Sequence, residues 1–117
     1  MQRVTIYHNP ACSKSREALA ILEERGIDHE IVNYLKTPPD RSTLLRLISA
    51  SEDDPVAFVR TTDRKFTDAE LRLTRDAQIE EVCDLLAAHP EVLQRPIVVA
   101  RGRVIIARPP SRLLEML

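Results

Sequence analysis

Hydrophobic and polar residues in the first third of the chain follow two periods in turn. The run Val4–Tyr7 is β-branched and aromatic and predicts a short strand. Between Ser13 and Arg25 apolar residues recur at helical spacing, and Gly26 offers the left-handed residue that ends many helices. A second apolar run predicts a strand from Glu30 to Leu35. Together these elements predict a βαβ unit with parallel strands and a right-handed crossover.

The middle of the chain, about residues 40–90, shows helical patterns instead of strand patterns. Apolar residues from Leu44 to Ile48 predict a helix that is capped near Asp40 or Ser42. Asp54-Pro55 has the form of an N-cap followed by proline at the first helical position. It therefore predicts a short helix that continues through Arg60.

Two further helix signals follow in this middle segment. Thr67 and Glu70 have the spacing of a capping box, which predicts a helix start. Apolar positions from Ile79 to Leu86 recur at helical spacing, and the helix is expected to end at His89-Pro90. Cys83 falls on the apolar stripe of this helix, so we expect it to be a buried packing residue.

The last part of the chain predicts a hairpin and a final helix. Ile97–Ala100 and Val104–Ala107 are apolar runs separated by Arg101-Gly102, which predicts a tight turn between antiparallel strands. Pro96 directly precedes the first of these strands and is a candidate cis proline. Ser111 is the expected cap of the last short helix.

This order of elements predicts an α/β fold, a thioredoxin-like sandwich with a mixed sheet. We expect a single domain over residues 1–117, built from a βαβ unit, a helical insertion and a ββα unit. No apolar run has transmembrane length, and Met1-Gln2-Arg3 does not begin a signal-peptide pattern. We therefore expect a cytoplasmic protein without membrane association, and two distant cysteines do not suggest a disulfide framework.

Charge is unevenly distributed although the net charge is only −1. Residues 1–16 carry +3 and residues 92–117 carry +4, which leaves −8 on residues 17–91. If the two ends meet in the fold, they form a positive site within a mildly acidic protein. Such a site suits a small anion better than nucleic acid, although charge alone fits a solvated basic surface equally well.

Cys12 is the strongest candidate for chemistry because it lies between a predicted strand and a predicted helix. Unpaired backbone N–H groups and the helix dipole at a helix N-terminus favour a thiolate. His8, Lys14 and Arg16 are expected to add positive charge nearby. The sequence therefore predicts a lowered pKa for the Cys12 thiol.

Two cysteine motifs are excluded by the spacing around Cys12. A Cys-x-x-Cys dithiol would need a second cysteine where the chain has Ser15, so this thiol has no local resolving partner. A Cys-x5-Arg phosphate loop would need arginine where the chain has Ala18. Residues from elsewhere in the chain must therefore hold any bound oxyanion.

One set of residues, running from the first strand to the last helix, carries a family resemblance: Tyr7-His8-Asn9-Pro10-Ala11-Cys12, Ser15-Arg16, Tyr34-Leu35, Pro38-Pro39, Arg60, Arg95-Pro96-Ile97-Val98-Val99 and Arg108-Pro109. With these residues the chain resembles the glutathione- and glutaredoxin-coupled arsenate reductases of the ArsC family. The resemblance implies a thioredoxin-like fold and a single nucleophilic cysteine, Cys12.

The resemblance also implies roles for five further residues. Arg60, Arg95 and Arg108 match the three arginines that hold arsenate in the family, while His8 lowers the thiol pKa and Ser15 supports the thiolate. Guanidinium groups suit a tetrahedral dianion because they form paired, charge-assisted hydrogen bonds. Glutathione is implied as the co-substrate and glutaredoxin as the partner that recycles the enzyme. We expect a monomer with no bound cofactor and no metal.

Two other functions are compatible with the sequence. A glutathione-linked thiol oxidoreductase would need the Cys12 thiolate but not all three arginines. A non-enzymatic regulator like the Spx proteins, which bind RNA polymerase, would share the fold. Such sensors commonly carry Cys-x-x-Cys, and Ser15 argues against a redox switch of that design.

Overall fold

A mixed four-stranded sheet forms the centre of the protein in the computed structural model, which describes residues 3–117. The strands are β1 (Val4–His8), β2 (His29–Asn33), β3 (Ile97–Ala100) and β4 (Arg103–Ile106). They lie in the order β2-β1-β3-β4, with β1 parallel to β2 and antiparallel to β3. Because β1 and β2 are parallel, their carboxyl ends meet at one edge of the sheet.

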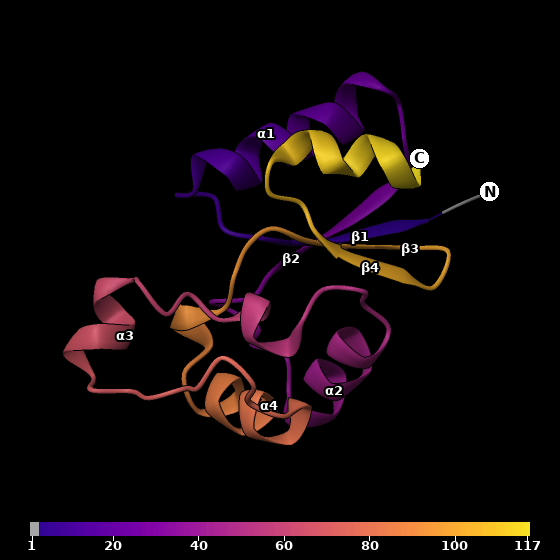
Figure 1. The fold of residues 1–117 in the computed structure, drawn as a ribbon. Helices are drawn as coiled ribbons and strands as arrows, with labels where there is room; N and C mark the ends of the chain where they lie inside the picture. The colour runs from indigo at the N-terminus through magenta and orange to yellow at the C-terminus, as the bar shows by residue number, and fades with distance from the viewer. Residues whose placement is uncertain (1–2) are drawn as a thin grey trace.

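Helices cover both faces of this sheet (Figure 1). α1 (Ser13–Glu24) and the 3₁₀ helix η3 (Pro110–Met116) lie on one face, and α2 (Arg41–Ser49) and α4 (Ile79–Ala88) lie on the other. Shorter helical segments connect them: η1 (Pro55–Phe58), α3 (Arg64–Asp68) and η2 (Pro90–Val92). The expected α/β sandwich with a thioredoxin-like arrangement and a helical insertion is therefore confirmed.

The alternating pattern of β1 explains how the two layers form. Val4 and Ile6 are fully buried and pack with Ala18 and Leu22 of α1. Tyr7 projects to the opposite face, against the larger core that α2 and α4 share with the sheet. One strand thus contributes to two cores, as its period of two residues requires.

Most predicted elements of the sequence are present, but some boundaries differ. The short helix that starts at Pro55 is the 3₁₀ helix η1, which ends at Phe58 and does not continue through Arg60. The second strand begins and ends slightly earlier than the predicted Glu30–Leu35 run. The capping box at Thr67 and Glu70 is wrong, because Asp63 caps α3 by accepting a hydrogen bond from Lys65 N at 2.8 Å. Thr67 lies inside that helix, and Glu70 follows it with a φ of 55°.

The last helix also differs from its prediction. It is a 3₁₀ helix that begins at Pro110, so Ser111 lies within it and is not its cap. Two prolines in succession fix the φ angles at its start, and Pro109 takes the N-cap position. Within residues 3–117 no helix is both long enough and apolar enough to cross a membrane.

Candidate active site

Cys12 occupies the N-cap of α1, directly after the loop that leaves β1. Asn9 shapes this loop, because its carbonyl accepts a hydrogen bond from Cys12 N and its side-chain oxygen accepts one from Ala11 N, both at 3.0 Å. Cys12 O in turn accepts the first helical hydrogen bond, from Arg16 N at 3.0 Å. The thiol therefore lies at the carboxyl edge of the sheet, between a strand and a helix as the sequence predicted.

The pKa of the Cys12 thiol is lowered, and the helix N-terminus contributes as the sequence predicted, but the side-chain charge comes from another residue than expected. Burial by itself would raise this pKa. The backbone N–H of Ser15, the Arg95 guanidinium and the backbone N–H of Lys14 favour the thiolate and together outweigh burial. A helix N-terminus and one distant arginine thus activate the sulfur.

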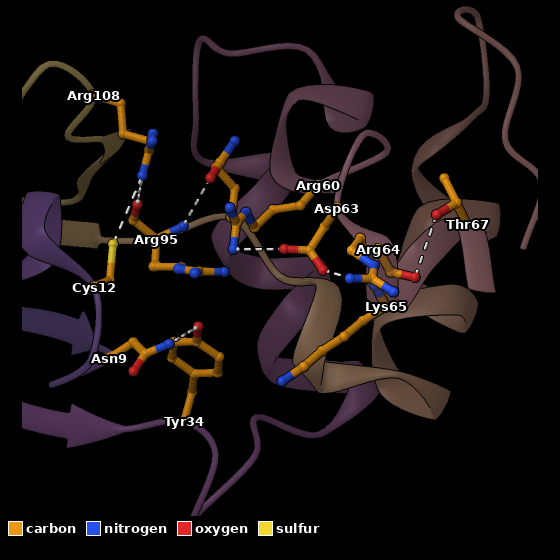
Figure 2. A network of polar contacts seen from close by, with 11 residues as sticks. Asn9, Cys12, Tyr34, Arg60, Asp63, Arg64, Lys65, Thr67, Arg95 and Arg108 are labelled. Atoms are coloured by element: carbon orange, nitrogen blue, oxygen red, sulfur yellow. Dashed lines mark hydrogen bonds and ion pairs between the residues drawn. The ribbon is translucent and has the colours of Figure 1, made fainter. Parts of the chain in front are cut away.

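Arg95 and Arg108 converge on Cys12 from the hairpin end of the chain (Figure 2). Arg108 Nη1 lies 3.8 Å from Cys12 Sγ and donates a hydrogen bond to Arg95 O at 3.0 Å. Arg95 Nε is buried and has no hydrogen-bond partner. Among residues 3–117, neither guanidinium lies within ion-pair distance of a carboxylate. The site therefore combines a stabilised thiolate with two arginines that have no carboxylate partner among the described residues.

Both arginines directly precede a cis proline. The Arg95–Pro96 bond is cis, which confirms the candidate from the sequence, and the Arg108–Pro109 bond is cis as well. Ala107 N donates to Pro96 O at 2.9 Å and joins the two segments. The chain thus presents two arginines side by side from positions that lie far apart in sequence.

The backbone around Arg60 pairs with the segment that precedes Arg95. Arg60 N donates to Val92 O and Gln94 N donates to Phe58 O, both at 2.8 Å. The Arg60 guanidinium, however, forms an ion pair with Asp63 at 3.0 Å (Figure 2). Unlike Arg95, this arginine already has an anionic partner.

His8 and Ser15 form a buried pair behind the cysteine loop. His8 Nδ1 lies 2.6 Å from Ser15 Oγ, and Asn9 N donates to the same oxygen at 3.0 Å. Because Oγ accepts from Asn9, its own proton can point to His8 Nδ1, which fits a neutral imidazole. Burial lowers the pKa of His8, and the neighbouring Arg16 lowers it further.

This geometry corrects the expectation about positive charge next to Cys12. Neutral His8 supports the loop through Ser15 and supplies no charge to the sulfur. Arg16 is directed to Pro10 O, to which it donates at 2.8 Å, and the Lys14 side chain pairs with Glu17 at 3.6 Å. The charge that favours the thiolate comes from Arg95.

Tyr34 is a site residue to which the sequence analysis gave no role. It follows β2 and is fully buried, and its hydroxyl accepts a hydrogen bond from Asn9 Nδ2 at 3.5 Å. Burial raises the pKa of Tyr34, while Arg95 and Asn9 act in the opposite direction. The sequence contained a signal for this position. Tyr34 comes just after a predicted strand parallel to the first one, so it lies at the same edge of the sheet as Cys12.

The described residues show no cluster suited to a metal. Within residues 3–117, no three His, Cys, Asp or Glu side chains are grouped to hold an ion. The polar groups around Cys12 are instead guanidinium and amide donors, which complement an anion.

Comparisons with known proteins agree with this geometry. A family profile described as "ArsC family" matches residues 7–116. An arsenate reductase of Neisseria meningitidis serogroup A is 42% identical over 118 residues, which cover 93% of each chain. An Escherichia coli K12 protein named "Uncharacterized protein YfgD" is 39% identical over 119 residues, covering 98% of this chain and 97% of its own.

A solved structure named as an arsenate reductase from Vibrio cholerae has the same fold. It superimposes with a TM-score of 0.88 and 37% sequence identity, covering 99% of this chain and 98% of its own. The family profile and these full-length similarities leave no part of the fold unmatched. The chain therefore belongs to the ArsC family.

Proposed function

We propose that this protein is an arsenate reductase that uses Cys12 as its nucleophile and glutathione with glutaredoxin as its source of electrons. One observation carries the proposal. The thiol with the lowered pKa lies beside two arginines that have no carboxylate partner among residues 3–117. Reduction of an oxyanion requires a thiolate next to a site for the anion, whereas simple thiol exchange requires only the thiolate. The thiolate beside two arginines therefore supports oxyanion reduction.

In the first step, Arg95, Arg108 and Arg60 hold arsenate, a tetrahedral dianion near neutral pH. The Cys12 thiolate attacks arsenic, a sulfur–arsenic bond forms, and one arsenic–oxygen bond breaks. The leaving oxygen takes up protons and departs as water. Arginine suits this task because it neutralises the dianion without protonating the thiolate.

In the second step, a glutathione thiolate attacks the sulfur of Cys12 in the adduct. The sulfur–arsenic electron pair passes to arsenic, which is reduced from As(V) to As(III) and leaves as arsenite. Cys12 is left as a mixed disulfide with glutathione. A glutaredoxin thiol then attacks the glutathione sulfur, and the Cys12 thiolate departs.

We infer that Arg95 and Arg108 meet the anion before Arg60. Arg108 Nη1 lies 3.8 Å from Cys12 Sγ, and Arg95 favours the Cys12 thiolate and has no carboxylate partner among residues 3–117. Arg60 must exchange Asp63 for the oxyanion, and its backbone pairing beside Arg95 puts it within the same region. We also propose that the protein works as a cytoplasmic monomer without a bound cofactor.

A coupled assay tests the function. The purified protein is mixed with arsenate, glutathione, glutaredoxin, glutathione reductase and NADPH, and arsenite formation is measured directly alongside NADPH loss. We expect turnover that requires every component and disappears in Cys12→Ser. Reduction of a glutathione-linked disulfide without any arsenite formation would instead assign the protein to the thiol oxidoreductases.

A further inference from the structure

A second polar cluster lies where the loop after α2 meets the end of β4. Asp53 Oδ2 accepts a hydrogen bond from Ile106 N at 3.2 Å, and Arg112 Nη1 donates to Ile106 O at 2.8 Å. The same Arg112 nitrogen lies 3.4 Å from both carboxylate oxygens of Asp53. Asp53 and Arg112 thus hold both backbone polar groups of Ile106 and pair with each other.

Ile106 is connected to the active site by a very short path. Arg108 N donates to Ile106 O at 2.9 Å, so the chain turns sharply between β4 and Arg108. The Arg108 guanidinium then reaches Arg95 O at 3.0 Å and Cys12 Sγ at 3.8 Å. The Ile106 carbonyl therefore holds the backbone of Arg108, from which the side chain extends to Arg95 O and Cys12.

Burial and charge distinguish this pair from an ordinary surface ion pair. The Arg112 side chain is 32% exposed and the Asp53 side chain 20% exposed. The charge of Asp53 is balanced by that of Arg112. A hydrogen bond within its own loop also fixes Asp53, because Asp53 N donates to Ser51 Oγ at 3.1 Å.

We propose that Asp53 and Arg112 are positioning residues that fix the Arg108 guanidinium beside Cys12 and the bound oxyanion. They act through Ile106 and touch neither the sulfur nor the substrate. The arsenate measurement below rests on the proposed function. A second measurement on Cys12 does not, so a failure of one idea can be told from a failure of the other.

The experiment compares Asp53→Ala and Arg112→Met with two matched controls. Glu52→Ala removes an exposed acidic residue from the same loop, and Arg103→Met removes an exposed arginine from β4. Arsenate kcat/KM is measured for each variant. Cys12 alkylation rates are also measured with iodoacetate and with iodoacetamide, because the ratio of the anionic to the neutral reagent reports positive charge at the sulfur.

We expect Asp53→Ala and Arg112→Met to lower arsenate kcat/KM by about 5- to 20-fold, mainly through KM, since the anion site is displaced while the nucleophile remains. The iodoacetate to iodoacetamide ratio should fall by roughly 3-fold. Both controls should stay within about 2-fold of the parent protein. Arg112→Lys, which keeps one donor, should recover part of the loss.

Double variants separate positioning from general destabilisation. In an Arg108→Ala background, Asp53→Ala should change neither measurement further, because its effect passes through Arg108. An equal loss in both backgrounds, or an unchanged alkylation ratio in Asp53→Ala, would overturn the inference. If the parent protein forms no arsenite, the proposed function fails, and the alkylation ratio still decides the role of Asp53.

Discussion

Arg95 combines two properties that are rarely found together in one arginine. Its Nε is buried without a hydrogen-bond partner, and among residues 3–117 its guanidinium has no carboxylate within ion-pair distance. An unsatisfied buried donor costs free energy, so such a group persists where a ligand completes it. Arg95 also favours the Cys12 thiolate. This residue therefore serves both the nucleophile and the proposed oxyanion.

Removing Arg95 should consequently weaken both the binding of the oxyanion and the stabilisation of the Cys12 thiolate. Because a hydrogen bond to a charged group contributes about 1.5–3 kcal/mol, Arg95→Ala should lower arsenate kcat/KM by roughly 10- to 100-fold. It should also raise the pKa of Cys12, measured from the pH dependence of iodoacetamide alkylation. Arg95→Lys should restore part of the kcat/KM but not the paired hydrogen bonds of a planar guanidinium.

Arg60→Ala provides the matched comparison for Arg95. The Arg60 guanidinium is already paired with Asp63 and is not among the main causes of the lowered pKa of Cys12. We expect a similar loss of arsenate turnover with an unchanged alkylation profile. Full arsenate turnover in Arg60→Ala would remove this arginine from the proposed site.

The two cysteines should differ strongly in reactivity. Cys12 has a lowered pKa, whereas burial raises the pKa of Cys83 and leaves its side chain fully inaccessible. Near neutral pH, Cys12 should be alkylated at least about 10-fold faster than Cys83. Peptide mass mapping after brief labelling measures both rates, and comparable labelling of the two thiols would contradict the proposed activation of Cys12.

The position of Cys12 and the contribution of the helix N-terminus to its lowered pKa could be predicted from local sequence patterns, but the side-chain charge that favours the thiolate could not. A strand, a Pro-containing loop and a helix are local patterns, and they place Cys12 at an N-cap. Arg95 and Tyr34 reach the site only through long-range pairing of strands. The alternation of β1 puts His8 on the same face as the buried Val4 and Ile6, but its contact with Ser15 and the effect of Arg16 on its pKa depend on the folded loop.

The end of α1 shows how one residue type fixes an element boundary. Gly26 has a φ of 64°, and its N–H donates to Glu23 O at 3.1 Å. Ile27 N donates to Leu22 O at 3.0 Å, which completes a Schellman motif. No neighbouring atom lies within 4 Å of a Cβ built at Gly26, so only backbone strain opposes a side chain there.

Gly26→Ala should therefore lower the free energy of unfolding by about 1 kcal/mol. Gly26→Asn should cost less, because asparagine tolerates the left-handed region. Chemical denaturation of both variants measures the difference. An alanine variant as stable as the parent would show that the helix end relaxes to another conformation.

Element boundaries were predicted best where a single residue determines them. Gly26, Asp40 and the Arg101-Gly102 turn behave as expected, because each supplies a local conformation or cap. The α3 region was predicted wrongly because two residues, Asp63 and Thr67, compete as caps and only tertiary packing of Phe66 selects one. Short segments with little apolar surface are decided by their neighbours and not by their own sequence.

Buried His8 also makes the stability of the whole molecule depend on pH. Burial and Arg16 lower its pKa from the ordinary value of 6.5, so the unfolded chain binds a proton more readily than the folded protein. The free energy of unfolding should therefore fall as the pH decreases below about 6.5, and level off below the folded pKa. The free energy of unfolding is retained at higher pH, where His8 is neutral in both the folded and the unfolded chain.

His8→Asn removes this titration while keeping an acceptor near Ser15 Oγ. The free energy of unfolding of this variant should vary less with pH than that of the parent. Urea denaturation between pH 5 and 8, about the range over which histidine titrates, measures it. His29→Asn, which removes a different imidazole, serves as the control. A parent protein whose stability rises on acidification would contradict a buried neutral His8.

Across the whole molecule, the two thiols belong to separate environments. Cys12 lies at the carboxyl edge of the sheet, at the start of α1, whereas Cys83 lies in the core between the sheet, α2 and α4. Cys83 is 0% exposed, and its pKa is raised. For Cys83 to reach the Cys12 adduct, α4 would have to leave its core, and the cost of exposing that core opposes such a movement.

The thiol that resolves the arsenic adduct should therefore come from outside the chain. Cys83→Ala is the cleanest test, because serine would bury a hydroxyl in an apolar core and destabilise α4. We expect Cys83→Ala to keep arsenate turnover within about 2-fold of the parent and to depend on added glutathione as strictly as the parent does. If a folded Cys83→Ala variant loses turnover, the resolving thiol is internal, and the proposed use of glutathione is wrong.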